Sequence, residues 1–269
     1  MSTSYRTFFG MKKEAFSSDL IPKEIFETDD IRSVQQRFDY AVRLGAVALL
    51  TGEIGSGKST ALRYVAAKLH PSEYRAIHIT ACSGSILEFY RLFLAELNID
   101  KSSTSRAVMI RLIKKEIQEL VLGKKLKVVL IVDEASLMRL EVFAELHTIT
   151  QFEQDSKPWL PIILAGKTNL IDLLTYQTSM PLASRIVARS HMEPVSRSHM
   201  QEYLSHHLSI IGVNTALFDE TAVTAIHQGS GGLFRKANNL ARGALIAAAA
   251  GQSMTVSAEH VRLASTEVF

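Results

Sequence analysis

The segment G-E-I-G-S-G-K-S at residues 52–59 decides the fold of this chain. It follows the apolar run at residues 47–50, which predicts a buried strand, and a helical pattern continues from it to residue 69. Glycines in such a turn let successive backbone N–H groups point at phosphate oxygens, and the helix that begins there adds the positive end of its dipole. The segment is a complete phosphate-binding loop, so the sequence predicts that the chain binds a nucleoside triphosphate.

Two side chains of the loop have expected roles toward the ligand. Lys58 is expected to reach the β and γ phosphates, and the Ser59 hydroxyl is expected to hold Mg²⁺. ATP and Mg²⁺ are therefore the expected cofactors. The residues expected to contact the nucleotide are those of the loop and the one after it: Gly52, Glu53, Ile54, Gly55, Ser56, Gly57, Lys58, Ser59 and Thr60.

A second motif points from binding to hydrolysis. Residues 127–132, K-V-V-L-I-V, form an apolar run without alternation, which is typical of a strand buried on both faces of a parallel sheet, and the run ends in Asp133 and Glu134. We expect Asp133 to bind Mg²⁺ and Glu134 to polarise the water that attacks the γ phosphate. Both carboxylates could instead cap the following helix. The catalytic interpretation is favoured because ligands of such sheets bind at the carboxyl ends of the strands.

Composition limits the remaining possibilities. The 269 residues, 47% hydrophobic and 21% charged, suffice for one large α/β domain and a smaller companion. Cys82 is the single cysteine, so no intrachain disulfide is expected and a reducing cytoplasm is the expected compartment. No apolar stretch reaches the roughly 20 residues of a membrane helix, so no membrane contact is expected. His199, His206 and His207 lack a plausible set of accompanying ligands and are interpreted as helix residues rather than a metal site.

The hydrophobic pattern predicts the domain organisation. Strand and helix patterns alternate to about residue 190, with further strands at 75–80 and 160–165, and only helices follow, at about 196–210, 219–228, 233–250 and 257–266. The expected fold class is α/β, a P-loop core with a parallel sheet flanked by helices plus a small all-helical C-terminal lid. The expected boundaries are 1–30 for an N-terminal extension, 31–193 for the nucleotide-binding domain and 194–269 for the lid.

The order of these features resembles an AAA+ ATPase. The resemblance also includes Arg185 and Arg189 after the last predicted strand, and the segment G-L-F-R-K-A-N at residues 232–238. The opening F-F-G-M-K-K-E-A-F at residues 8–16 resembles the ExeA-like branch, which contains general-secretion ATPases and short regulators of DNA transposition of the TnsC, TniB and MuB type. The chain is interpreted as closest to these transposition regulators.

The resemblance assigns further roles. Arg185 is similar to the arginine finger that reaches a neighbouring subunit's ATP, with Arg189 as the alternative, and Arg235 is similar to sensor 2 of the lid. The plainer alternative is that these are ordinary solvated arginines. Sensor 1 should follow residue 165, where a small polar residue is usual. The lysine in this stretch departs from that pattern, which leaves three candidates: Lys167, Thr168 and Asn169.

The resemblance to transposition regulators also implies partners. Such proteins form homo-oligomeric rings or helical filaments on double-stranded DNA without sequence preference, recruit or stimulate a transposase, and disassemble on ATP hydrolysis. The sequence shows neither the membrane span nor the cell-wall-binding region of the general-secretion members, which favours this reading. The DNA-binding candidates lie in one polar connection, which could also be an ordinary loop: Lys101, Ser103, Thr104 and Arg106. Lysines at 114–115 and 124–125 are secondary candidates.

Two other functions stay open. The chain could be an ExeA-like general-secretion ATPase that assembles or remodels a protein complex. It could also be a nucleotide-gated switch with negligible turnover, in which case Glu134 would have no catalytic role.

Overall fold

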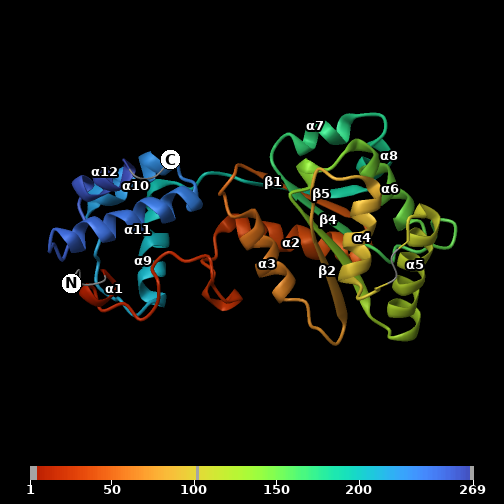
Figure 1. Cartoon of the computed structure of the whole chain (residues 1–269), viewed down its shortest axis with the longest axis horizontal. Helices are drawn as coiled ribbons and strands as arrows, with labels where there is room; N and C mark the ends of the chain where they lie inside the picture. The colour runs from red at the N-terminus through yellow and green to blue at the C-terminus, as the bar shows by residue number, and fades with distance from the viewer. Residues whose placement is uncertain (1–4, 101–102, 267–269) are drawn as a thin grey trace. The chain divides into compact units, whose positions relative to one another are not determined.

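The computed structural model describes residues 5–100 and 103–266 (Figure 1). Contacts within the chain divide it into two compact units. We call the first the sheet unit; it comprises Thr28–Gly52 and Lys58–Met192. We call the second the helical unit; it comprises Glu53–Gly57 and the described parts of residues 1–27 and 193–269. The phosphate-binding loop thus belongs to both units, because its tip groups with the helices and its two ends with the sheet.

The sheet unit is built on five parallel strands in the order β2-β3-β4-β1-β5. Their bounds are Val47–Gly52 for β1, Tyr74–Thr80 for β2, Lys127–Asp133 for β3, Ile162–Gly166 for β4 and Ile186–Met192 for β5. Helices pack around the strands (Figure 1). The parallel sheet flanked by helices that the sequence predicts is confirmed.

Two of the three interior strands, β1 and β3, illustrate how sequence sets strand position. All six residues of β1 are buried, and so are residues 128–132 of β3. Such continuous apolar runs suit a strand that is covered on both faces. A strand with one face in solvent would instead alternate apolar and polar residues. In the observed register Leu49 pairs with Leu164, and Leu130 pairs with Ile162. The register therefore aligns the carboxyl ends of β1, β3 and β4 at one edge of the sheet.

One helix of the sheet unit precedes the first strand, and the others lie between strands in the sequence. The helices are α2 (Asp29–Leu44), α3 (Lys58–Ala67), α4 (Ile86–Glu96), α5 (Arg106–Gln118), α6 (Leu140–Thr150), α7 (Leu170–Thr175) and α8 (Met180–Ala183). Local sequence sets several ends: Thr28 and Ser85 cap α2 and α4 with their hydroxyls, and Gly45 ends α2 in a left-handed conformation with φ +66°. The chain continues from α5 into a π-helical turn, Glu119–Gly123.

Strand β5 is one of the elements that sequence reasoning missed, together with α2, α7 and α8. The segment I-V-A-R-S-H-M alternates between buried and exposed side chains, with Ala188, Ser190 and Met192 buried. It lies at one edge of the sheet and pairs only with β1 among the described strands. Its short, mixed sequence carries little strand signal because an edge strand buries only one face. Arg189 is therefore a strand residue.

The helical unit consists of α1 (Tyr5–Phe8), α9 (Arg197–Ile210), α10 (Glu220–Ser230), α11 (Phe234–Ala250) and α12 (Ala258–Ser265), with a single 3-10 turn at Pro22–Glu24. The last four helices match the predicted ones within about two residues at each end. The N-terminal segment packs against them: the Phe16 ring stacks on His207 at 5.4 Å, and Arg242 donates hydrogen bonds to the carbonyls of Ala15 and Phe16. The predicted N-terminal extension, residues 1–30, includes this segment.

The two neighbouring histidines of α9 have partners within the helical unit. His207 is buried and stacked, and its neighbour His206 bonds to the carbonyl of Glu24 through Nε2. Within residues 5–100 and 103–266, no helix combines the length and the hydropathy of a membrane-crossing segment.

Candidate nucleotide-binding and catalytic site

The candidate site is built on the carboxyl ends of three neighbouring strands. β1 ends at Gly52, β3 at Asp133 and β4 at Gly166, and β4 lies between the other two. Because the strands are parallel, their carboxyl ends meet at one edge of the sheet. The two motifs, at residues 52–59 and 127–134, are thereby brought to the same edge, as expected of a nucleotide site.

The phosphate-binding loop has the backbone conformation that its glycines allow. Gly55 and Gly57 have φ values of +87° and +101°, which residues with a side chain rarely adopt. The Ser56 side chain is buried, and its hydroxyl has no hydrogen-bond partner among the described residues. A buried, unpaired hydroxyl in a loop of this shape fits a phosphate oxygen as its missing partner.

The loop leads directly into α3, whose first residue is Lys58. Lys58 is only 7% exposed, and its Nζ donates a 2.9 Å hydrogen bond to the carbonyl of Gly52. This contact folds the ammonium group back over the loop. Ser59 follows in the first turn of α3 with its side chain exposed, and Glu53 and Ile54 are exposed at the tip of the loop while Thr60 is half-buried.

The acidic pair after β3 has an unusual backbone. The Asp133 carboxylate accepts a 2.8 Å hydrogen bond from the N–H of Glu134, and Glu134 adopts the left-handed conformation with φ +53° and ψ +31°. A non-glycine residue pays about 1 kcal/mol or more for this conformation, and such strain clusters at functional sites. Both side chains are half-buried, so they are available to a ligand at this edge. A hydroxyl and a carboxylate, here from Ser59 and Asp133, are oxygen ligands suited to Mg²⁺.

The end of β4 lies against the segment that follows the acidic pair. A side chain at Gly166 would come within 2.9 Å of the Ser136 backbone nitrogen, and the Ser136 hydroxyl accepts a 3.3 Å hydrogen bond from the N–H of Lys167. The three sensor 1 candidates directly follow β4, and all are exposed: Lys167, Thr168 and Asn169. They lie at the correct edge of the sheet, and the choice among them stays a prediction.

Sequence reasoning missed a polar pair beside the loop. Thr51 is 2% exposed, and its hydroxyl lies 2.9 Å from Nδ1 of His191 and 3.4 Å from the carbonyl of Ser190. The pair ties β1 to β5 one residue before the phosphate-binding loop. No local sequence pattern predicts this contact, because Thr51 and His191 are 140 positions apart and meet only through strand pairing.

Arg185 lies at the amino ends of the strands, opposite the carboxyl ends that carry the two motifs. It directly precedes β5, and its carbonyl accepts a hydrogen bond from the N–H of Val47, the first residue of β1. Its guanidinium donates to Nδ1 of His147 at 3.0 Å and forms a 2.5 Å ion pair with Asp155. Burial and the nearby positive charge of Arg185 lower the pKa of His147. Arg189 instead lies in β5, exposed, opposite Leu49.

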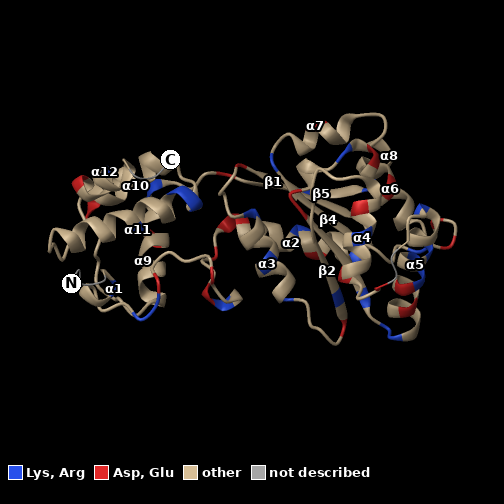
Figure 2. Cartoon of the chain, in the orientation of Figure 1, with Lys and Arg blue, Asp and Glu red and all other residues tan. Residues whose placement is uncertain are grey.

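Arg235 is the second residue of α11 in the helical unit, and the first turn of α11 is basic (Figure 2). Its backbone N–H donates a 3.2 Å hydrogen bond to the carbonyl of Gly55, and a Cβ atom added at Gly55 would lie 2.8 Å from the Cβ atom of Arg235. Within the helical unit, the structure therefore brings the sensor 2 candidate onto the tip of the phosphate-binding loop. The Arg235 side chain is exposed.

The DNA-binding candidates fall in the connection between α4 and α5. Lys101 lies outside the described residues, Ser103 is half-buried, and Thr104 is exposed. Arg106 begins α5 and pairs with the buried carboxylate of Glu145, which also accepts a hydrogen bond from the Tyr90 hydroxyl. Arg106 thus holds α5 against α4 and α6, a role that the sequence did not reveal.

The class of the protein follows from the fold, the site and a family match. Residues 43–174 match the model of the family described as an AAA domain. Together with the strand order β2-β3-β4-β1-β5 and the two motifs at the carboxyl edge, this match establishes the P-loop AAA+ fold.

A curated relative refines the assignment. General secretion pathway protein A of Aeromonas hydrophila is 29% identical over 267 residues, which are 98% of this chain and 48% of that protein. The chain therefore spans about half the length of the curated relative that it matches. The similarity agrees with the resemblance to the ExeA-like branch that the sequence motifs indicate.

Solved structures share the fold. Cdc6p from Pyrobaculum aerophilum has a TM-score of 0.75 and 18% identity, covering 94% of this chain and 70% of that chain. The Aeropyrum pernix ORC1 protein in complex with DNA has a TM-score of 0.71 and 16% identity, covering 94% of this chain and 68% of that chain. At such low identity the likeness establishes the fold alone.

Proposed function

We propose that this chain is a Mg²⁺-dependent ATPase that assembles into a homo-oligomer on duplex DNA and regulates or recruits a transposase, with ATP hydrolysis driving disassembly. In this proposal residues 31–193 bind the nucleotide, the lid begins at residue 194, and the protein acts in the cytoplasm. The loop from Gly52 to Thr60 holds the phosphates, Ser59 and Asp133 hold Mg²⁺, and Glu134 activates water.

The observation that carries the proposed assembly is the separation of Arg185 from the phosphate-binding loop. The carbonyl of Arg185 bonds to the first residue of β1, and the loop begins at the last one, Gly52. β1 has six residues, and each strand residue rises about 3.3 Å, so its two ends are roughly 17 Å apart. An arginine side chain cannot span that length. As an arginine finger Arg185 would therefore act on the nucleotide of a neighbouring copy, so hydrolysis would require assembly.

The other basic residues have proposed roles in the same scheme. Arg235, next to the loop tip, would act as sensor 2 and contact the phosphates, and Arg189 is the alternative finger. Because Arg189 lies near the middle of β5, it is closer than Arg185 to the carboxyl edge of its own subunit. This position favours Arg185 as the residue that works between copies.

DNA binding is supported by chemistry and by fold analogy. The connection between α4 and α5 offers hydroxyl groups at Ser103 and Thr104 beside Lys101 and Arg106, a set suited to phosphate oxygens. The ORC1 protein of the same fold was solved in complex with DNA. Binding through such groups would be sequence-independent and sensitive to salt. The transposase as partner rests on the resemblance of the chain to transposition regulators.

A second candidate function has an observation of its own. The similarity over 98% of the chain to general secretion pathway protein A favours an ATPase that assembles or remodels a protein complex such as a secretion apparatus. Both functions use the same nucleotide site, so they differ only in what the assembled ATPase acts upon.

One experiment separates these candidates. Electron microscopy and ATPase assays with a slowly hydrolysed ATP analogue, with and without duplex DNA, should show DNA-dependent oligomers that become fewer as salt rises. The Lys101→Gln variant should lower the slope of log affinity against log salt by about one, while Lys23→Gln, an exposed lysine of the helical unit, should leave it unchanged. If the number of oligomers and the rate of ATP turnover were the same with and without DNA, the protein-remodelling function would be favoured.

A further inference from the structure

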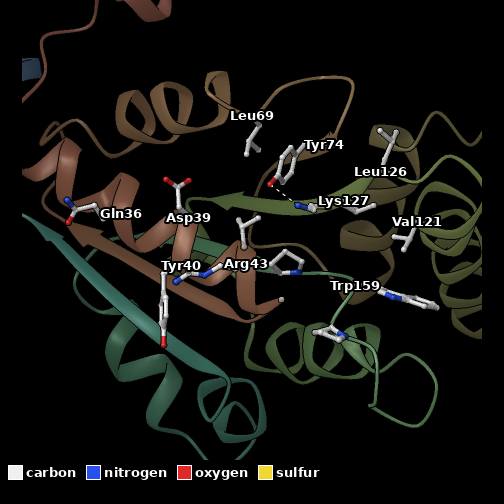
Figure 3. Close-up of a pocket in the computed structure, with 15 residues that line it drawn as sticks. Gln36, Asp39, Tyr40, Arg43, Leu69, Tyr74, Val121, Leu126, Lys127 and Trp159 are labelled. Atoms are coloured by element: carbon white, nitrogen blue, oxygen red, sulfur yellow. Dashed lines mark hydrogen bonds between the residues drawn. The ribbon is translucent and has the colours of Figure 1, made fainter.

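The sheet unit contains an open cavity that plays no part in the nucleotide site. Its volume is about 610 Å³, and Figure 3 shows the residues that line it. They come from the second half of α2, from the first residues of β2 and β3, and from the segment before β4. These are the amino ends of the strands, so the cavity lies at the edge of the sheet opposite Asp133 and Glu134.

The walls of the cavity resemble those of a small-molecule site. Three aromatic side chains, Tyr40, Tyr74 and Trp159, line it together with Pro158 and Pro161. The Trp159 ring is held in place by Phe152, at 5.4 Å between ring centroids. Pockets for small organic ligands are typically 300 to about 1,000 Å³, largely apolar and aromatic, with a few polar groups that fix orientation. Both the volume and the lining agree with that description.

Two cations project into this aromatic lining. The guanidinium of Arg43 lies over the Tyr40 ring at 5.6 Å, and Nζ of Lys127 lies over the Tyr74 ring at 5.2 Å and 3.4 Å from the Tyr74 hydroxyl (Figure 3). Within the part of the chain that the structure describes, neither cation forms an ion pair with a carboxylate. The rings hold the two positive groups in place without neutralising them.

The charge balance of the lining selects the ligand. Asp39 is the single carboxylate among the lining residues, against the two cations. A ligand with one anionic group would meet these cations, and a planar ring would stack on Tyr40, Tyr74 or Trp159. The lining lacks the glycine-rich turn and helix N-terminus that cradle a triphosphate, so a single anionic group suits it better.

We propose that this cavity is a second ligand site, which binds a small organic anion made of a planar ring and one anionic group. Two sources supply this chemistry, a mononucleotide or an aromatic residue at the carboxyl end of a protein chain. The inference rests on the cavity and its side chains, and it stands whether or not the proposed action on DNA is correct.

Trp159 gives a direct readout, because it is the only tryptophan of the chain and lines the cavity. Its fluorescence is followed during titration with adenosine 5′-monophosphate in one arm and N-acetyl-L-phenylalanine in the other. A saturable change in either arm is expected, and the responding arm identifies the source. The uncharged counterparts, adenosine and N-acetyl-L-phenylalaninamide, should bind at least about tenfold more weakly, since each lacks the charge-assisted hydrogen bonds.

Variants locate the signal. Arg43→Gln and Lys127→Gln should each weaken binding by about tenfold or more, while Lys124→Gln, an exposed lysine outside the cavity, should leave it unchanged. The signal must also persist in Lys58→Ala, which disables the phosphate-binding loop; its loss there would assign the mononucleotide to that loop and overturn the proposal. The proposal would also be overturned if neither arm gave a saturable change, or if the Arg43 and Lys127 variants bound the ligand as tightly as the original chain. Thermal melting checks that these variants fold.

Discussion

Arg185 is bound inside its own subunit by Asp155, at 2.5 Å between Nη2 and Oδ2. Asp155 ends a turn in which three successive non-glycine residues, Glu153, Gln154 and Asp155, have φ values of +46°, +53° and +69°. Each costs about 1 kcal/mol or more, so the turn is strained and persists because its surroundings hold it. A finger that acts on a neighbouring copy must first leave this ion pair. In the proposed assembly, the strained turn would therefore influence how readily Arg185 leaves Asp155.

Replacing Asp155 should release Arg185. The Asp155→Asn variant is expected to raise ATP turnover by roughly two- to fivefold at limiting protein concentration, because a partly exposed ion pair is worth up to about 1 kcal/mol. Steady-state turnover measured against protein concentration checks this. Glu153→Gln, in the same strained turn but outside the ion pair with Arg185, is the matched control and should behave as the original chain. A drop in turnover for Asp155→Asn would instead make Asp155 a residue that positions Arg185 for catalysis.

Replacing Glu134 tests hydrolysis itself. If Glu134 polarises the attacking water, Glu134→Gln should lower turnover by about 10² to 10⁴ while nucleotide affinity stays unchanged, and the ATP-bound oligomers should persist. Turnover by phosphate release and assembly by size-exclusion chromatography measure the two effects. Little change in either quantity would identify a nucleotide-gated switch. Lys58→Ala should remove nucleotide binding altogether, which separates the two roles.

Replacing Gly55 tests the approach of Arg235 to the loop. A Cβ atom at Gly55 would lie 2.8 Å from the Cβ atom of Arg235, and the backbone there has φ +87°. Gly55→Ala should therefore weaken nucleotide binding as well as stability. Gly231→Ala is the matched control, because Gly231 also has positive φ, +59°, but meets no atom within 4 Å. It should cost about 1 kcal/mol of stability by strain alone and leave nucleotide affinity unchanged. If calorimetric titration gave the same nucleotide affinity for Gly55→Ala and Gly231→Ala, the close approach of Arg235 to the loop would have no role in nucleotide binding.

Replacing Arg106 separates packing from DNA contact. Its loss leaves the buried Glu145 carboxylate with Tyr90 as its remaining partner, so Arg106→Ala should lower the free energy of unfolding by about 1–2 kcal/mol. The figure is modest because the Arg106 side chain is 52% exposed. The double variant with Glu145→Gln should recover part of the loss in urea unfolding. Unchanged stability with a reduced salt dependence of DNA affinity would instead show that Arg106 binds phosphate.

The pH dependence of stability should carry the signature of His207. Burial, with a smaller effect of His206, lowers the pKa of His207 from 6.5 to about 4. Because the unfolded chain binds the proton more readily, stability is full above pH 6.5 and falls as the pH drops toward 4, by up to roughly 3 kcal/mol. His207→Phe should flatten this part of the curve in urea unfolding at several pH values. His70→Gln, at an exposed histidine, should not alter it.

The nucleotide motifs and most elements could be predicted from sequence because their signals are local. The segment 52–59 and the run that ends at Asp133 need only neighbouring residues to be recognised, and the amphipathic helices of the last 75 residues have regular spacing. Strand β5 gave no such signal, since its edge position buries only alternate side chains. The local pattern around Arg189 accordingly predicts no strand there.

The contacts of the candidate site depended on pairing between distant segments. Thr51 meets His191, Arg185 meets Asp155, and Arg106 meets Glu145 only because the sheet and its helices bring them together. The separation of Arg185 from its own phosphate-binding loop also follows from strand pairing rather than from any pattern near Arg185. Sequence by itself determined that this chain binds a triphosphate, because backbone geometry and charge in one short loop suffice for that. Tertiary structure decided where the Arg185 side chain can reach, because that position depends on which end of β1 pairs with the start of β5.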